Sequence, residues 1–160
     1  MSLYEKHKAI LDRALQAIHE RTFYAAYAEH PKAYGEEAPK AGEEEYKNLL
    51  NNNFNTLLQG DAKEFAGEEI SPYTMTALGV KYPIQDSKEV IEKSKAAFKS
   101  WKKISVQERA GALVETIEEI KKHFFSIAYA TMHTTGQSFM MSFQASDAEK
   151  MLFYFFNCFH

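Results

Sequence analysis

The chain offers few residues that could do chemistry, and its single cysteine, Cys158, is the first of them. A nucleophilic cysteine needs a lowered thiol pKa and a neighbouring base or oxyanion donor. Cys158 instead stands among aromatic residues, two positions from the last residue, and burial there would raise the pKa of a thiol. We therefore interpret Cys158 as an unpaired terminal thiol. A single cysteine also excludes an internal disulfide and the cysteine-rich zinc sites.

Two histidines, His123 and His133, are the next candidates for a base or a metal ligand. Their spacing places them on different faces of a helix, whereas a helical zinc pair needs a spacing of about four residues. We therefore predict no metal site. His133 precedes the sequence Thr134-Thr135-Gly136, so we expect its ring to donate to the last carbonyls of a helix, where its charged form is favoured.

Two further clusters have a structural interpretation. The acidic run Glu43–Glu45 predicts a solvated helix start, which the helix dipole favours, and not an acidic metal site. The same holds for Glu36, Glu37, Glu68 and Glu69. A second cluster combines aromatic and methionine side chains at helical spacing, which is typical of a core and not of a soft-metal site. It comprises Phe139, Met140, Met141 and Phe143.

The elements that position these residues begin with a helix. Ser2 and Glu5 fit a capping box, and a helical apolar pattern then continues to about Arg21. That pattern consists of Leu3, Ile10, Leu11, Ala14 and Ile18, and an aromatic anchor of Phe23, Tyr24 and Tyr27 follows it. Prolines and glycines predict a loop over 31–42, followed by a short helix from Glu43 to about Leu50 and irregular structure over 51–67.

Residues 69–83 carry the β signal of the chain. Apolar and polar residues alternate across Tyr73–Ala77 and again across Val80–Tyr82. Pro72 and Gly79 restrict these strands to a hairpin or a sheet edge. Two short strands are not stable alone in water, so we expect the rest of their sheet to come from elsewhere.

The second half predicts helices. Asp86 and Glu89 mark one start, followed by an expected buried stripe of Val90, Ile91, Ala97, Phe98 and Trp101. Ser105 and Glu108 start a long helix to about Thr131, and Gly136 is the expected C-cap. Its predicted buried stripe is Val106, Ala110, Leu113, Ile117, Ile120 and Phe124, and Glu118 and Lys122 form a helical pair.

This stripe makes a prediction about stability. Leu113→Ala or Ile117→Ala should cost on the order of 2–5 kcal/mol, whereas Glu115→Ala should cost under about 0.5 kcal/mol.

Composition bounds the class of protein. The 160 residues are 45% apolar and 26% charged with a net charge of −3, which indicates globular material and disfavours nucleic acid as a partner. The sequence contains no run of about 18 apolar residues, so we predict no membrane span. The segment Met1–Asp12 lacks the apolar core of a signal peptide, so we expect a cytoplasmic protein.

The second half also carries a resemblance. Lys95-Ala96-Ala97-Phe98, then Trp101, Ser105-Val106-Gln107-Glu108-Arg109 and Thr135-Gly136-Gln137 resemble, in order and spacing, segments of the aldehyde dehydrogenase superfamily. A narrower segment, His133–Ala145, closely resembles the aldehyde dehydrogenase-like protein of phenylacetic acid degradation, the PaaN type. Ile70–Tyr73, Leu78–Val80 and Tyr82-Pro83 are similar to that family as well.

The resemblance implies a fold and a domain organisation. We expect a mainly α chain with a small β hairpin or edge element, forming the N-terminal portion of an aldehyde dehydrogenase-like α/β fold. The N-terminal segment is residues 1–146, and residues 147–160 depart from the family as a divergent apolar tail.

The resemblance also implies a reaction. Aldehyde dehydrogenases oxidise an aldehyde through a cysteine thiohemiacetal and pass hydride to NAD or NADP. We predict no catalytic, cofactor-binding or metal residue on this chain, because the family's nucleophile, general base and cofactor glycines have no counterpart in it.

Two functions follow. The first is an N-terminal fragment of an NAD(P)-dependent aldehyde oxidoreductase of phenylacetic acid degradation, inactive alone. The second is a freestanding helical interaction or regulatory module derived from that family. For partners we expect self-association or the missing remainder of the enzyme, because the apolar tail Met151–Phe159 and unpaired strand edges favour association.

Overall fold

The computed structural model describes residues 1–55, 62 and 64–145 of the chain. Their helices are α1 (Leu3–Glu20), the short 3-10 helix η1 (Pro31–Tyr34), α2 (Glu37–Leu49), α3 (Ser87–Trp101), α4 (Val106–Lys121), α5 (Phe124–Thr135) and α6 (Phe139–Ala145). Two strands, β1 (Glu64–Ala66) and β2 (Tyr82–Ile84), pair antiparallel. The predicted fold class, mainly α with a small β element, is confirmed. The predicted tail 147–160 and Cys158 lie outside the described residues.

The helix boundaries follow the predicted capping residues. The side chains of Ser2, Asp86 and Ser105 each accept a hydrogen bond from the backbone N–H three residues later, at the starts of α1, α3 and α4. Arg21 ends α1 in the left-handed conformation, with a φ of 53°. Gly136 ends α5 with a φ of 76°, which a glycine adopts without strain, so the predicted C-cap is confirmed.

The predicted loop over 31–42 is wrong, because η1 and the first turns of α2 occupy it. Pro39 lies in the first turn of α2, where the missing N–H of proline leaves no intrahelical hydrogen bond unmade. Gly42 is buried where α2 meets α5, and a Cβ there would lie 2.9 Å from the backbone of Phe125. In this segment proline and glycine mark a helix start and a close helix contact.

The predicted strand over Tyr73–Ala77 is also wrong. Ser71 accepts hydrogen bonds from the N–H groups of Tyr73 and Thr74, so its side chain competes with a strand for the backbone donors. The result is a tight loop closed by an antiparallel bridge between Ile70 and Ala77.

The observed sheet differs from the predicted one in position. β2 overlaps the predicted strand Val80–Tyr82 only at Tyr82, and it pairs with β1, which lies inside the segment predicted to be irregular. All three β1 residues are exposed. β1 therefore lacks the alternation of buried and exposed side chains on which the prediction of a strand depends.

The predicted long helix is two helices. α4 ends at Lys121 and α5 begins at Phe124, with His123 between them outside helical geometry. Neighbouring positions of a straight helix point about 100° apart, yet Phe124 and Phe125 are both buried. The break lets α5 turn away from α4 and bury both rings.

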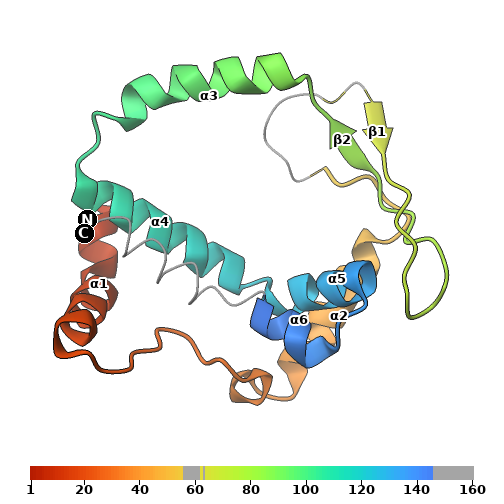
Figure 1. Cartoon of the computed structure of the whole chain (residues 1–160), viewed down its shortest axis with the longest axis horizontal. Helices are drawn as coiled ribbons and strands as arrows, with labels where there is room; N and C mark the ends of the chain where they lie inside the picture. The colour runs from red at the N-terminus through yellow and green to blue at the C-terminus, as the bar shows by residue number, and fades with distance from the viewer. Residues whose placement is uncertain (56–61, 63, 146–160) are drawn as a thin grey trace.

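The hydrophobic core lies where two helix pairs meet. α1 packs on α4, and α5 packs on both α2 and α6, as Figure 1 shows. The buried cluster takes residues from α1, α4, α5, α6 and the segment before η1, namely Leu11, Tyr27, Val114, Ile117, Phe124, Phe125, Ala128 and Phe143. Ile117 is thus in the core as predicted, whereas Leu113 is only half-buried and Val106 is exposed.

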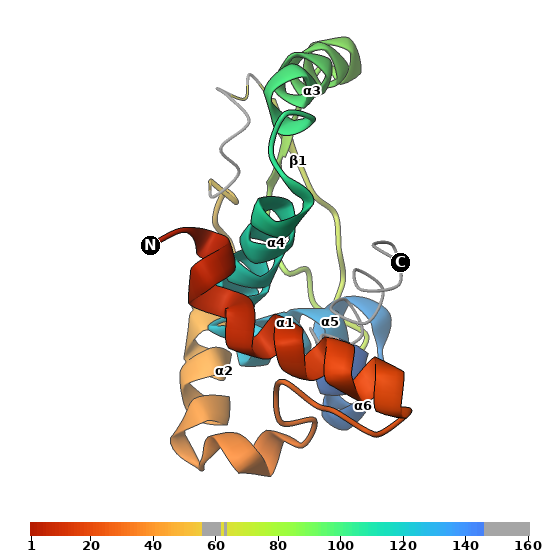
Figure 2. The same cartoon turned by 90° about the vertical axis from the view of Figure 1, so that its left-hand side faces the viewer.

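The sheet and α3 form an arm outside this core. Both views place α3 on the far side of the molecule from α1, α2 and α6 (Figures 1 and 2). None of the α3 residues is buried. Among the described residues no helix is long and apolar enough to cross a membrane.

Candidate functional site

The most chemically suggestive contact joins Ser71 and His133. The Ser71 hydroxyl lies 2.8 Å from His133 Nδ1, and the Ser71 side chain is fully buried. Because the Ser71 oxygen already accepts the N–H groups of Tyr73 and Thr74, its own hydrogen points to Nδ1. His133 is therefore the acceptor, so its Nδ1 carries no proton and the ring is neutral.

Burial supports this neutral state of His133. It lowers the pKa of the imidazole below its usual 6.5, and the nearby carboxylate of Glu43 opposes the shift only in part. The ring is stacked on Tyr46 with the centroids 5.0 Å apart, and Tyr73 meets it edge-on at 5.9 Å. The expectation of a charged His133 bonded to helix carbonyls is wrong, because Ser71 takes that hydrogen bond.

Tyr73 makes the contact with the helix end that the sequence assigned to the histidine. Its hydroxyl donates to the carbonyls of Gln137 at 2.6 Å and Gly136 at 3.2 Å. The loop at Ser71–Thr76 is thereby fastened to the carboxyl end of α5. A serine with no exposed surface cannot attack a substrate in this conformation, so the Ser71–His133 pair positions a loop and is not a nucleophilic dyad.

His123 lies at the opposite end of α5 and belongs to another contact. Its Nδ1 hydrogen-bonds to Glu45 on α2, which ties the two helices together. Across the described residues, no three histidine, cysteine or acidic side chains are close enough to hold a metal ion.

The acidic run Glu43–Glu45 forms surface ion pairs, but it does not lie at the start of its helix. α2 begins at Glu37, six residues before Glu43. Glu43 pairs with Lys47 and Glu45 with His123. The predicted position at a helix start is therefore wrong, and the carboxylates form ion pairs along the helix instead.

A polar network that the sequence did not reveal joins α1 to α4. His7 is 5% exposed, and its Nε2 lies 2.5 Å from a carboxylate oxygen of Glu115. Lys6 donates to the same carboxylate at 2.7 Å, and these two partners lower the pKa of Glu115. The expectation that Glu115 is a dispensable surface residue conflicts with these contacts. The spacing of Glu115 from the apolar stripe gave no sign of a partner on another helix.

One turn further, Glu118 accepts a hydrogen bond from Tyr27 at 2.7 Å. Burial raises the pKa of Glu118, but the bonds from Tyr27 and Lys121 outweigh burial and hold it below its usual range. The predicted pair of Glu118 with Lys122 is replaced by Glu118 with Lys121 and Glu119 with Lys122. These contacts fix α1 and the segment after it on α4.

The predicted aromatic and methionine core is confirmed in part. Phe143 is buried, and Phe139 packs against the core. Met140 and Met141 are 37% and 58% exposed. They occupy the outer side of α6, a single short helix that has only one side against the core.

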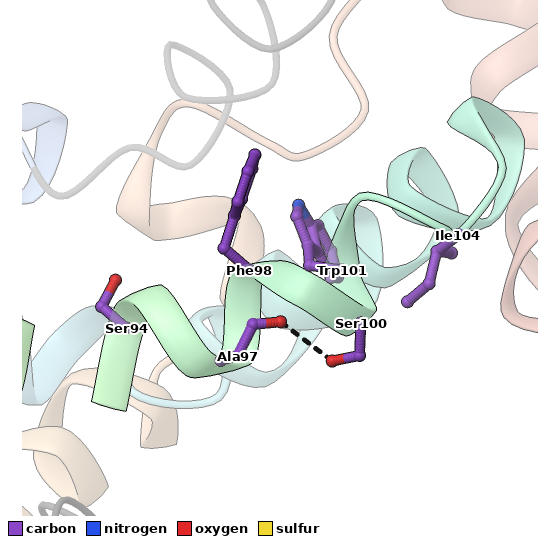
Figure 3. A pocket seen from close by; sticks show the side chains of 6 residues that line it. All are labelled: Ser94, Ala97, Phe98, Ser100, Trp101 and Ile104. Atoms are coloured by element: carbon purple, nitrogen blue, oxygen red, sulfur yellow. Dashed lines mark hydrogen bonds between the residues drawn. The ribbon is translucent and has the colours of Figure 1, made fainter. Parts of the chain in front are cut away.

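The predicted buried stripe of α3 is wrong for the described residues. Ile91 is 52% exposed, Phe98 is 59% exposed and Trp101 is 38% exposed. Phe98 and Trp101 project from the same side of the helix (Figure 3). Together with Ser94, Ala97, Ser100 and Ile104 they line an open hollow of about 360 Å³. The periodicity identified the apolar face correctly, but no described element packs on it.

Among the described residues, no glycine-rich turn joins a parallel strand to a helix. Dinucleotide sites place such a turn between a parallel strand and the start of a helix. Here the only sheet among the described residues is antiparallel, and Gln85 and Asp86, which lead from β2 into α3, contain no glycine.

Comparison with known proteins gives a consistent result. The sequence profile of the aldehyde dehydrogenase family matches residues 60–157. The chain is also similar to a solved structure, the NAD-dependent aldehyde dehydrogenase from Burkholderia multivorans, with 38% sequence identity and a TM-score of 0.81. That match covers 91% of this chain and 26% of the other, so this chain spans about a quarter of that enzyme's length. No curated protein matches the sequence.

Proposed function

Because the chain belongs to the aldehyde dehydrogenase family, we propose that it is the N-terminal portion of an NAD(P)-dependent aldehyde oxidoreductase that acts in phenylacetic acid degradation. The observation that carries the proposal is the match to an NAD-dependent aldehyde dehydrogenase over 91% of this chain, with 38% identity. The aldehyde class rests on the segment His133–Ala145, which resembles the PaaN-type protein. The proposed substrate is an aldehyde formed by ring opening of a phenylacetate-derived intermediate.

In this proposal the chain contributes structure and the rest of the enzyme contributes chemistry. The described residues fasten a loop to α5 through Ser71 and Tyr73, and they fix α1 on α4 through Glu115. We expect the nucleophile to lie in the rest of the enzyme, so the full chain alone should not reduce NAD or NADP in the presence of an aldehyde. Calorimetry should detect no micromolar binding of either cofactor, and binding with a defined stoichiometry would contradict this part of the proposal. The proposed location is the cytoplasm.

A hybrid enzyme tests the oxidoreductase activity. In it, residues 1–145 of this chain replace the matched segment of the Burkholderia multivorans enzyme. We expect aldehyde-dependent reduction of NAD by the hybrid and none by this chain alone. A folded hybrid without activity would contradict the proposal.

Growth tests the place in metabolism. Deleting the gene should abolish growth on phenylacetic acid as the sole carbon source and leave growth on succinate unchanged. Normal growth on phenylacetic acid would remove the phenylacetate part of the proposal and leave the family assignment intact.

A freestanding interaction module is the second candidate, and one observation favours it. Residues far apart in the sequence, such as Leu11, Ile117 and Phe143, share one buried cluster. A segment with its own core could fold without the rest of an enzyme. Cooperative unfolding of a dilution-resistant monomer, combined with an inactive hybrid, would favour the module.

A further inference from the structure

Met75 lies in the tight loop that the bridge between Ile70 and Ala77 closes, and it is 78% exposed. A thioether with this exposure meets a dissolved oxidant without any movement of the chain. Oxidation of methionine to the sulfoxide is a common lesion in proteins, and it is reversible. The exposed sulfur of Met75 is therefore a candidate for a reversible covalent modification.

The other methionines provide a comparison within the same chain. Met141 is 58% exposed and Met140 is 37% exposed, both on α6, and Met132 is half-buried on α5. Met1 is fully exposed at the first residue. Among the described methionines that follow Met1, Met75 thus has the most exposed side chain.

Backbone hydrogen bonds keep Met75 in this exposed position. Its N–H donates to the carbonyl of Ser71 at 2.8 Å, and the N–H of Ser71 donates to the carbonyl of Thr76 at 2.9 Å. These bonds hold Met75 in the left-handed conformation, with a φ of 54°. Because Ser71 and Tyr73 also fasten the loop to α5, the exposure belongs to an ordered loop and not to a frayed segment.

We propose that Met75 is a site of reversible oxidation by hydroperoxides, an inference that does not depend on the proposed function. The sulfur attacks one oxygen of hydrogen peroxide, the O–O bond breaks, and an S–O bond forms. The proton of the transferred oxygen passes to the departing hydroxide, so the products are a sulfoxide and water, and the thioether supplies the two electrons. A methionine sulfoxide reductase reverses the step, in which a dithiol becomes a disulfide and the sulfoxide oxygen leaves as water.

The exposure of Met75 also predicts that the fold tolerates this change. A sulfoxide is polar and disrupts a packed core, so oxidation is harmful where the side chain is buried. At Met75 the added oxygen faces water. Met132 is half-buried on α5, so a sulfoxide there would displace packed neighbours. We therefore expect Met75 to react before Met132 and without a loss of stability.

Oxidation kinetics measured by peptide mass spectrometry test the proposal. The full chain is treated with dilute hydrogen peroxide, once folded and once unfolded in urea, and is then digested with trypsin. Met75 is the single methionine of the tryptic peptide 64–81, and the peptide 123–150 reports Met132 after fragmentation. For Met75 we expect the folded and unfolded rates to agree within about twofold, whereas Met132 should react at least about fivefold more slowly in the folded chain.

Met75→Leu is the matched control for stability, because it keeps the size of the side chain and removes the sulfur. After equal peroxide treatment, the wild type and Met75→Leu should show the same melting midpoint by circular dichroism. Dithiothreitol with the two methionine sulfoxide reductases, one for each sulfoxide epimer, should restore Met75 in the folded wild type.

Three results would overturn the proposal. The first is a rate at Met75 that folding lowers as much as it lowers the rate at Met132. The second is a sulfoxide at Met75 that the two reductases leave unchanged in the folded chain. The third is a larger fall of the melting midpoint in the oxidised wild type than in oxidised Met75→Leu.

Discussion

The contact between Ser71 and His133 makes a quantitative prediction, because one buried oxygen serves three partners. Ser71→Ala removes the hydrogen bond to His133 Nδ1 at 2.8 Å and those from the N–H groups of Tyr73 at 3.2 Å and Thr74 at 3.3 Å. A typical intramolecular hydrogen bond contributes about 1 kcal/mol net, and a buried group left without a partner costs more. Since two of the three bonds are long, we expect a total loss of about 2–3 kcal/mol.

Urea unfolding followed by circular dichroism at pH 7.5 measures this loss. The control is Ser94→Ala, which removes an exposed hydroxyl from α3 and should change stability by less than about 0.5 kcal/mol. A double-mutant cycle with His133→Gln should give a coupling energy on the order of 1 kcal/mol. A loss at Ser71 no larger than that at Ser94 would show that the loop is not held by this contact.

The same contact predicts a dependence on pH, and its sign follows from the burial of His133. The pKa of His133 in the folded chain lies below its usual 6.5, so the unfolded chain binds the proton more readily. The stability contributed by the neutral ring is therefore fully present above pH 6.5 and decreases as the pH falls below it. Protonation would also leave the Ser71 hydrogen without its acceptor. His133→Gln should flatten this part of the stability profile, and an unchanged slope would assign it to other groups.

Three further tests, made with five substitutions, examine the packing of the helices. Ile117→Ala should cost on the order of 2–5 kcal/mol because the side chain is 1% exposed, whereas the half-buried Leu113→Ala should cost less in the same unfolding assay. Gly111→Ala should destabilise the chain, since a Cβ there would lie 2.7 Å from the Cα of Tyr4 and outweigh the helix propensity gained; a rise in the melting temperature would refute this. Glu115→Ala should lower the urea midpoint more than Glu119→Ala, whose pair is exposed, and equal midpoints would count against the network.

The sequence predicted best what depends on neighbouring residues. The caps at Ser2, Asp86 and Ser105 and the helix end at Gly136 involve groups within about four residues of each other, so local chemistry determines them. The same local patterns misled where a residue serves a distant contact. Gly42 indicated a loop because the group that excludes a side chain there, the backbone of Phe125, lies on another helix and cannot be recognised from the neighbouring residues.

The site depended even more on distant partners. His7 and Glu115 are 108 residues apart, and Ser71 and His133 are 62 apart, so no spacing along the chain could indicate either contact. Among the candidates singled out by residue type, the partner given to His133 was wrong. A serine before a proline, as at Ser71-Pro72, is a weak signal of burial in a sequence, because serine is also common in exposed turns.

The distribution of burial explains why one sequence supports both a fragment and a module. The pairs α1 with α4 and α2 with α5 close around Ile117 and Phe125, so this part has the core that an independent domain requires. The arm of β1, β2 and α3 has no buried residue in its helix and a sheet of only two short strands, which is not stable alone. Selection for an independent module would favour polar residues at Ile91, Phe98 and Trp101, since exposed apolar side chains promote association. Apolar side chains at these positions suit a helix that the rest of a larger enzyme covers, and this favours the proposed dehydrogenase segment over the module.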